Sequence, residues 1–420
     1  MPPYIEITKA LDAASREERR DEKAKLLAHL LKSIPPEMIR PVVRLISGRL
    51  WPPWELREMG IGPETLGEVL EELSSQGAFE GEGRPDLEDR AEMMVLNRSQ
   101  QTLAPATMDS SFVYDALRQI SAQKGPGSLS RKKAILKGLF LNASPLEAKY
   151  IVRTVLGRTA AGLGPSLISA AIGKAFSVDE AMVKGAYARL PDFGVVALDA
   201  FRGEIFEVKL APPNPVRLMP LGREKLPPEA ITRAGLAAYV VWYGGLRVQV
   251  HKFNDQVFIY SSRLRNVTQP LSDLAEEVMM VEGNFVMEGE LILVRQGKIS
   301  PRMEMVARIN LRGRPRGSAI PSFAASDLLY LNGEELIDKG YAERRRALRE
   351  ALKGAAGEPL SAKVFLAQER VIGDLERARE FYQWSLDRGY RGIVLRDLEG
   401  HYTPGSKSRS DVAISRMPET

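Results

Sequence analysis

The sequence predicts a multidomain protein in which an all-α domain precedes an α+β domain. Its 420 residues are too many for one simple hydrophobic core. Residues 1–208 repeat apolar side chains at intervals of three and four, whereas apolar and polar residues alternate after a Pro-rich segment, 211–228. We therefore predict a helical domain over 1–208, a linker over 209–228 and an α+β domain over 229–420.

The composition favours a folded protein and excludes several kinds of chemistry. Hydrophobic residues make up 44% of the chain, enough for packed interiors. There is no run of about 18 apolar residues and no apolar leader core, so no membrane contact is predicted and a cytoplasmic location is expected. The lack of cysteine excludes disulfides and thiolate sites, and three separated histidines argue against a histidine metal site or triad.

Within the helical half, positive charge is concentrated in one block. Residues 118–189 hold twelve Lys and Arg against three Asp and Glu, a balance of +9, whereas residues 1–117 have fourteen against twenty-one, a balance of −7. A basic block of this kind is the electrostatic footprint of a polyanion binder. The alternative is a solvated helical face without a ligand.

Glycine-rich loops occur within the basic block. The segments "QKGPGSLSRKKAILKG" (123–138) and "RTVLGRTAAGLGPS" (153–166) each place glycines before a helical pattern. Glycine lets backbone amides approach a phosphate, and a helix N-terminus favours an anion, although most such glycines are only caps. We predict contacts with a duplex backbone from Lys124, Gly127, Ser128, Arg131, Lys132, Arg153, Arg158 and Gly164.

The second half has strand and turn signals. "LRVQVHKF" (246–253) alternates apolar and polar residues, Asn254-Asp255 supplies a turn, and "QVFIYSS" (256–262) returns. We expect the first strand of this hairpin to begin near residue 237 and to carry Trp242 to Gly245 at its centre. Further strands are predicted within 284–300 and 325–336, and amphipathic helices within 341–354 and 372–390.

Several motifs resemble those of the archaeal-type ATP-dependent DNA ligases. They are "GRLWPPWELREMGIGP" (48–63), "ASPLEAKYIVRTVLGR" (143–158) with its following "GLG", and a series in the second half. The resemblance implies a helical DNA-binding domain and a nucleotidyltransferase (adenylation) domain of the DNA-ligase/ATP-grasp-like type. It also implies ATP and Mg²⁺ as family cofactors, and a third, OB-fold domain that we expect to be absent.

The family's nucleophile motif is altered. In these ligases the lysine of K-Y-D-G-x-R attacks the α-phosphate of ATP and holds AMP as a phosphoramidate. The resemblance aligns this motif with Trp242 to Arg247, and the following "RVQVHK" fixes the register without a gap. Trp242 thus stands at the nucleophile, and an indole has no basic lone pair. Gly244 replaces the motif's aspartate, and Arg247 survives.

Other motifs depart from the family pattern as well. Ser262 replaces an arginine, Ser326 the aromatic residue that stacks on adenine, and Arg391 a metal-binding acid. Arg396 replaces the lysine of the same motif, and Ala413 and Ser415 replace two phosphate-binding lysines. The positions that survive are Arg247, Glu288 and Glu290.

These departures predict that no residue of the chain is catalytic and that no cofactor is used. If a metal bound at all, Glu288 and Glu290 would be its ligands, because hard cations prefer carboxylates. We expect instead that Arg391 pairs with one of these two acids. A rescuing lysine is not expected, since Lys252 lies about 30 Å along an extended chain from Trp242 and Lys225 lies in the linker.

The predicted function is that of an inactive ligase homologue that binds double-stranded DNA, nicked or broken, without sequence preference. Its role in repair or replication would be occupancy of DNA or recruitment of replication or repair proteins. One alternative is a ligase with residual or relocated adenylation activity. The other is a protein-partner scaffold, with a docking surface formed by Trp242, Tyr243 and Leu246.

Overall fold

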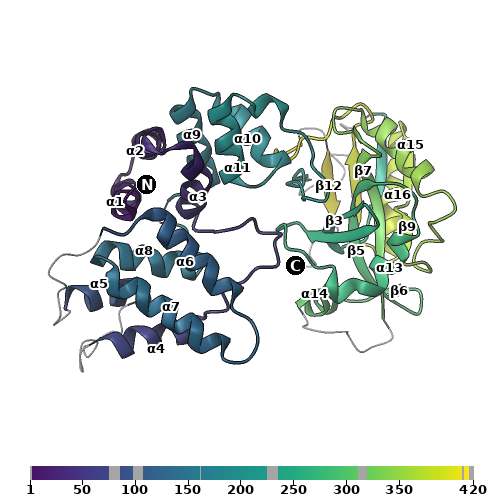
Figure 1. Ribbon diagram of the computed structural model, residues 1–420. Coiled ribbons are helices and arrows are strands. Elements are labelled where there is room, and N and C mark those ends of the chain that lie inside the picture. Colours follow the sequence, from purple (N-terminus) through teal and green to yellow (C-terminus); the bar gives the residue numbers. More distant parts are fainter. Residues whose placement is uncertain are drawn as a thin grey trace. The chain divides into compact units, whose positions relative to one another are not determined.

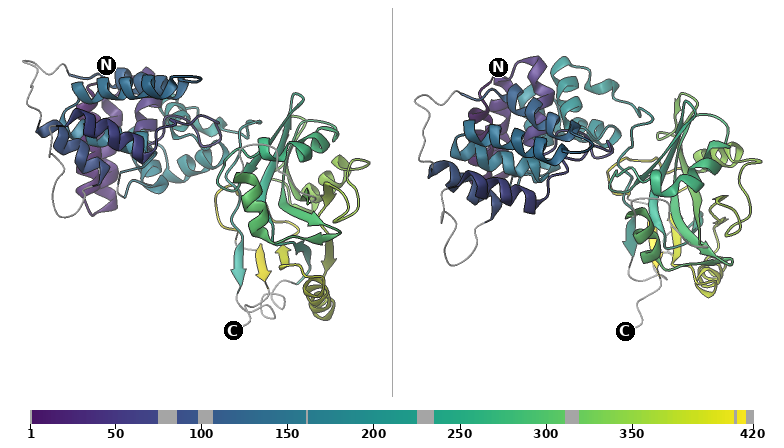
Figure 2. Two further views of the ribbon diagram at one scale, coloured as in Figure 1. Left: turned by 90° about the horizontal axis from the view of Figure 1, so that it is seen from below. Right: turned by 60° about the horizontal axis from the view of Figure 1, so that its bottom comes forward.

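The computed structural model describes residues 2–74, 86–97, 107–160, 162–224, 235–310, 319–408 and 411–415. The chain divides into two compact units (Figures 1 and 2). The first unit is Met1–Tyr187 with Pro191–Val208, and the second is Ala188–Leu190 with Lys209–Thr420. The first is helical and the second contains two sheets, as the sequence predicts.

The first unit is a bundle of helices around one hydrophobic core. Its helices are α1 (Tyr4–Arg16), α2 (Arg20–Ser33), α3 (Pro36–Ile46), α4 (Pro63–Leu73), α5 (Leu87–Leu96), α6 (Ser110–Ala122), α7 (Ser128–Asn142), α8 (Pro145–Val155), α9 (Pro165–Phe176), α10 (Glu180–Arg189), α11 (Phe193–Arg202) and the 3₁₀ turn η1 (Ile205–Glu207).

Local signals in the sequence account for several helix starts. α8 begins with a capping box, in which Ser144 accepts from the Glu147 amide and the Glu147 carboxylate accepts from the Ser144 amide. α3, α4 and α9 each carry proline in the first turn, where its missing N–H costs nothing. The residues between α3 and α4, 47–62, contain no helix or strand, and we call them the α3–α4 connector.

The second unit contains two sheets. The first has the strand order β1-β12-β11-β2-β10, and the second has the order β4-β3-β5-β7-β8, with β6 paired to β5 and β9 to β7. The strands are β1 (Gly222–Glu224), β2 (Ala237–Trp242), β3 (Leu246–Phe253), β4 (Gln256–Ser261), β5 (Phe285–Arg295), β6 (Lys298–Ile299), β7 (Ile320–Leu331), β8 (Glu334–Glu335), β9 (Val364–Leu366), β10 (Glu369–Ile372), β11 (Gly392–Arg396) and β12 (Val412–Ser415).

Helices cover these sheets. They are η2 (Gln269–Leu271), α13 (Ser272–Met279), α14 (Arg302–Asn310), α15 (Tyr341–Ala351) and α16 (Leu375–Asp387). α16 packs against β11, β10 and β2, whereas α15 packs against β7 and α13 against β4 and β7. The strands and helices predicted between 246 and 390 are confirmed, and the turn at Asn254 and Asp255 has positive φ at both residues.

The prediction that one continuous strand begins the hairpin is wrong. The chain from Ala237 to Phe253 is two strands, because β2 ends at Trp242 in one sheet and β3 begins at Leu246 in the other. Gly244 makes the change of direction with a φ of 81°. Trp242 therefore lies at the end of a strand, beside the passage from one sheet to the other.

The described part of the Pro-rich segment is not a free linker. Residues 209–224 belong to the second unit. Leu210, Val216 and Met219 are buried in a small core cluster with Tyr402, and β1 pairs in parallel with β12. Apolar side chains among the prolines thus anchor the segment, and the linker prediction is wrong for these residues. Residues 225–228, including Lys225, lie outside the described part of the chain.

Candidate functional site

The turn between β2 and β3 is held by one acid of the predicted site. The carboxylate of Glu290, on β5, accepts hydrogen bonds from the amides of Tyr243 at 3.0 Å and Gly245 at 2.7 Å. A Cβ on Gly245 would lie 2.5 Å from the carbonyl oxygen of Leu291, so no larger residue fits there. Both oxygens of Glu290 are therefore used to fix backbone.

The Glu290 carboxyl predicts a pH dependence of stability. Burial raises its pKa from 4.5 to about 7, against the opposing effect of the backbone amides. A raised pKa means that the folded state holds the proton more tightly than the unfolded state. The stability that the protonated Glu290 contributes is therefore complete below pH 4.5 and is lost as pH rises through 7. We expect the free energy of unfolding of the wild type to fall by about 3 kcal/mol relative to Glu290→Gln over that range. Urea unfolding of both proteins from pH 4 to 8 measures the difference between their free energies of unfolding. A difference that stays constant with pH would contradict the prediction.

The other acid, Glu288, is surrounded by partners from distant segments. Arg247 donates from Nε at 2.5 Å to its Oε1, and the Tyr402 hydroxyl donates to its Oε2. Arg247 also donates to the carbonyl of Met219 at 2.6 Å, and the Met219 amide donates to the Tyr402 oxygen at 2.9 Å. Glu288 is 1% exposed, so this network closes over its carboxylate.

The predicted pairing of Arg391 with Glu288 or Glu290 is wrong. Arg391 is exposed, and its guanidinium carbon lies 5.9 Å from the centroid of the Trp242 ring, within the range of a cation–π contact. The Arg391 amide donates to the Trp242 carbonyl at 2.9 Å. The ion pair at Glu288 is made by Arg247 instead. The residues at two altered motif positions, Trp242 and Arg391, thus contact each other.

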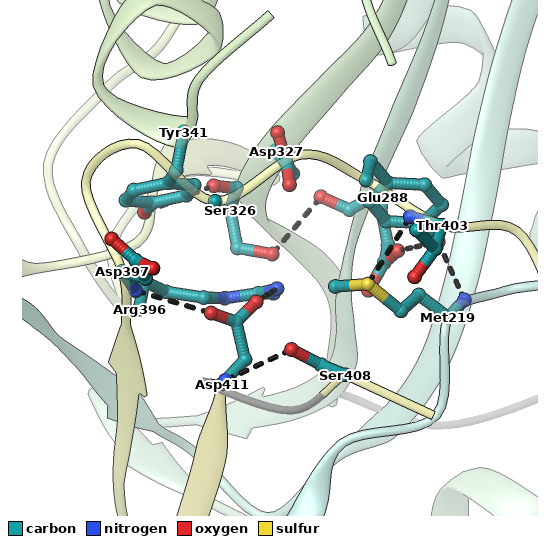
Figure 3. A network of polar contacts seen from close by, with 12 residues as sticks. Met219, Glu288, Ser326, Asp327, Tyr341, Arg396, Asp397, Thr403, Ser408 and Asp411 are labelled. Carbon is teal, nitrogen blue, oxygen red and sulfur yellow. Dashed lines mark hydrogen bonds and ion pairs between the residues drawn. The ribbon is translucent and has the colours of Figure 1, made fainter. Parts of the chain in front are cut away.

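Arg396, at another altered motif position, also has a partner within the second unit. Arg396 donates from Nη1 to Asp411 at 2.9 Å, and both side chains are buried (Figure 3). Burial alone would lower the pKa of Arg396, but the charge of Asp411 raises it above its ordinary value. Asp411 also accepts from the Asp397 amide at 3.1 Å, and its own amide donates to Ser408 at 2.9 Å.

The remaining altered positions offer no group suited to nucleotide chemistry. Ser326 donates to the carbonyl of Glu288 at 3.2 Å. Ala413 is buried in the sheet core, and Ser262 is exposed after β4. Ser415 lies at the end of β12, opposite Gly392.

The residues present do not fit the family's cofactors. Glu288 already has an arginine and a tyrosine on its two oxygens, and Glu290 holds two amides, so neither is free to ligate a hard cation. Within the described residues, no group of three or more His, Asp or Glu side chains comes together as a metal site. For ATP, the resemblance to the family predicts that an aromatic partner for adenine is missing at Ser326 and a nucleophile at Trp242.

Lys252, considered above as a rescuing nucleophile, points elsewhere. Its amine donates to the carbonyls of Met279 at 2.9 Å and Val281 at 2.6 Å, at the C-terminal end of α13. The residue is 8% exposed. A buried amine with two carbonyl acceptors stabilises a helix end and is not placed for attack on a phosphate.

The first loop predicted to contact phosphate lies before α7. Gly127 is the N-cap residue of α7 with a φ of 72°, and both Gly127 and Lys124 are exposed. Arg131 donates to the Gln123 side chain at 2.8 Å and to the carbonyls of Pro126 at 3.1 Å and Lys124 at 2.9 Å. Arg131 therefore shapes this loop, and Ser128 is partly exposed at the first position of α7.

Lys132 does not fit its predicted role. It is 9% exposed, and its amine donates to the carbonyl of Met59 in the α3–α4 connector at 2.7 Å. The prediction of a phosphate contact is wrong for this residue, because on α7 its side chain turns into the unit rather than toward solvent. The local sequence "SRKKAI" gives no sign of which lysine is buried.

The second loop predicted to contact phosphate joins α8 to α9. Arg153 is bound to the buried Glu88 at 2.5 Å and is mostly covered, whereas Arg158 lies 3.5 Å from Glu88 and its side chain is 53% exposed. Gly164 is exposed at the N-cap of α9. Arg158 and Gly164 thus remain available to a ligand, and Arg153 acts as a structural partner.

Both loops adjoin the α3–α4 connector. A Cβ on Gly48 would lie 2.5 Å from the carbonyl oxygen of Arg158, and one on Gly60 would lie 2.5 Å from the Lys132 amine. The connector therefore runs between the C-terminal end of α8 and the first turns of α7. This arrangement brings the two predicted loops to the same part of the first unit.

Two residues of the second unit were missed by the sequence reasoning. Tyr402 and Asp411 complete the networks around Glu288 and Arg396. Asp411 left a signal, since an acid two residues before the altered position Ala413 could neutralise the buried Arg396. Tyr402 left none, because its partner is 114 residues away.

Comparisons with known proteins agree with this architecture. The family model described as "DNA ligase N terminus" matches residues 3–164, and "ATP dependent DNA ligase domain" matches 228–412. A solved structure described as "Pmar-Lig_PreS3" covers 98% of this chain and 78% of that chain, with a TM-score of 0.57 and 11% identity, a likeness of fold alone. Among the described helices, none is long and apolar enough to cross a membrane.

Curated relatives extend over nearly the whole chain. The DNA ligase of Thermococcus fumicolans is 32% identical over 414 residues, which cover 94% of this chain and 72% of that protein. The DNA ligase of Archaeoglobus fulgidus is 32% identical over 409 residues, with the same two shares. Because both halves of the chain match in order and at this identity, the protein belongs to the ATP-dependent DNA ligase family.

Proposed function

We propose that this protein is a catalytically inactive DNA ligase homologue that binds duplex or nicked DNA through its first unit, without sequence preference. The observation that carries the proposal is Trp242, where the family's pattern has the nucleophilic lysine. Covalent transfer of AMP requires an amine at that point, and an indole cannot supply one.

The partners of the altered positions support loss of function rather than a moved active site. Trp242 contacts Arg391, and Arg396 contacts Asp411. Each contact gives an altered side chain a partner within the protein, as expected of a cleft that no longer has to admit a nucleotide. Catalysis tolerates displacements of about an ångström, and the amine of Lys252 is bound to two carbonyls.

An adenylation assay tests the proposal. The full chain is incubated with ATP and Mg²⁺, and its intact mass is measured by mass spectrometry. We expect no gain of the mass of AMP, whereas the Thermococcus fumicolans ligase, as a positive control, should gain it. A covalent adenylate on any lysine of this chain would show a relocated nucleophile and overturn the assignment.

The DNA-binding part of the proposal is supported by the basic block and by its exposed loop residues. Lys124, Gly127, Arg158 and Gly164 remain accessible next to the N-termini of α7 and α9. Contacts of this type read the phosphate backbone, so affinity should fall steeply with salt. The biological effect would be occupancy of nicks or broken ends, or recruitment of replication or repair proteins.

A further inference from the structure

The first unit contains an open cavity that lies outside the two phosphate-contact loops. Its volume is about 660 Å³, within the range of pockets that hold small ligands. It is lined by α3, the α3–α4 connector, α6 and the second half of α11. The lining is positively charged, because it contains two glutamates and five arginines: Arg40, Arg44, Arg57, Arg118 and Arg202.

One of these arginines is fixed and forms a rigid wall. Arg44 donates from Nη2 at 2.5 Å and from Nε at 3.3 Å to the two oxygens of the buried Asp192. Its Nη1 donates to the carbonyl of Leu50 and to the Tyr114 hydroxyl, each at 3.3 Å. Asp192 neutralises this guanidinium, so Arg44 contributes shape more than charge.

The other arginines are held loosely. Arg40 lies 3.9 Å from Asp192, Arg118 lies 3.8 Å from Asp115, and Arg202 lies 4.0 Å from Glu204. Each of these three side chains is about half exposed, and such pairs contribute little to stability. Arg57, paired with Glu55 at 3.1 Å, is similarly exposed. The donors of Arg57, Arg118 and Arg202, whose partners are exposed or partly exposed, can therefore turn to an anion without breaking a buried interaction.

The cavity also has an aromatic and apolar lining. Trp51 is partly buried, packs against the core of the unit and lines the cavity. Tyr114 is buried and donates to the carbonyl of Leu50 at 3.1 Å. An indole beside several guanidiniums is suited to a ligand that has both a flat ring and a multiply charged anionic end.

We propose that this cavity binds a nucleoside phosphate, with the phosphates on Arg57, Arg118 and Arg202 and the base against Trp51. Arginine matches phosphate through its planar, forked donors, and several arginines favour a multiply charged group over a single carboxylate. The same chemistry is offered by a free nucleotide and by the phosphorylated end of a single strand. These residues are distinct from those of the two loops predicted to contact duplex DNA.

Calorimetric titration of the full chain tests the site with two probes, ATP without Mg²⁺ and a 5′-phosphorylated trinucleotide. We expect Arg118→Gln with Arg202→Gln to weaken binding of the preferred probe at least tenfold. The control, Arg16→Gln with Arg19→Gln, removes two exposed charges outside the cavity. It should change the affinity for that probe less than twofold. Tighter binding of ATP identifies a free nucleotide, and tighter binding of the trinucleotide identifies a strand end.

Hydrogen exchange on the wild-type chain keeps the test decisive if a variant misfolds. Saturation with the preferred probe should protect amides in residues 36–57 and 114–118. Protection only in residues 237–253 would place the nucleotide in the ancestral adenylation cleft and overturn the proposal. Failure of both probes to bind would also overturn it, and neither result would alter the assays of adenylation or duplex binding.

Discussion

Reversing the charges of Lys124 and Arg158 together is expected to weaken binding of nicked duplex DNA by at least about 60-fold at about 0.1 M salt. Each lost phosphate contact removes about 0.9 from the slope of log affinity against log salt, or about eightfold at this concentration. Both side chains are exposed, and Arg158 has only a 3.5 Å pair with Glu88, so Lys124→Glu with Arg158→Glu should fold normally. Fluorescence anisotropy at several salt concentrations measures both the affinity and the slope.

A matched control separates these loops from net charge. Lys9→Glu with Arg16→Glu changes the net charge equally, and both residues are exposed on α1 in pairs one helical turn apart. We expect this control to keep at least a third of the wild-type affinity. An equal loss in both variants would mean that DNA responds to overall charge, and no binding by the wild type would favour the scaffold alternative.

Replacing Asp327 by Ala is expected to lower the free energy of unfolding of the second unit by about 3–5 kcal/mol. Asp327 and Arg344 have no exposed side-chain surface, and Arg344 donates to the two carboxylate oxygens at 2.9 and 3.0 Å. Arg344 also donates to the carbonyls of Lys339 at 2.5 Å and Gly400 at 3.0 Å. Without Asp327, a buried guanidinium keeps its charge but loses its counter-ion.

Urea unfolding monitored by tryptophan fluorescence measures this loss, with Trp51 and Trp54 replaced by Phe so that the signal comes from the second unit. The control is Glu343→Ala, on the same helix as Arg344, which removes an exposed pair with Lys339 and should cost less than about 1 kcal/mol. A loss of under about 1 kcal/mol for Asp327→Ala would mean that water reaches Arg344 or that another acid replaces the partner.

Much of the fold follows from periodicity that is visible along the chain. The change from helical spacing to alternation predicts the two units, and Asn254 with Asp255 predicts the turn between β3 and β4. The break at Gly244 could not be predicted in this way. A glycine within an apolar run is compatible with a bulge, a bend or a change of sheet, and the choice depends on strands that are distant in sequence.

For the site, the resemblance to the family predicts which positions are altered but not what their side chains contact. Arg247, Arg391 and Arg396 are all candidate partners for Glu288 and Glu290. The sequence predicts a pair between Arg391 and one of these acids. In the folded unit Glu288 is bound by Arg247 and Tyr402. Which cation reaches an acid depends on strand register and on the distance between side chains, and neither is encoded locally.

The sequence by itself determined the succession of a helical and an α+β unit and the membership of the ligase family, because these depend on residue type and spacing. Only the tertiary structure decided that Lys132 is buried, that Trp242 meets Arg391 and that Arg396 meets Asp411. Such pairings depend on which surfaces packing brings together, and they join residues that are far apart in the chain or on different elements.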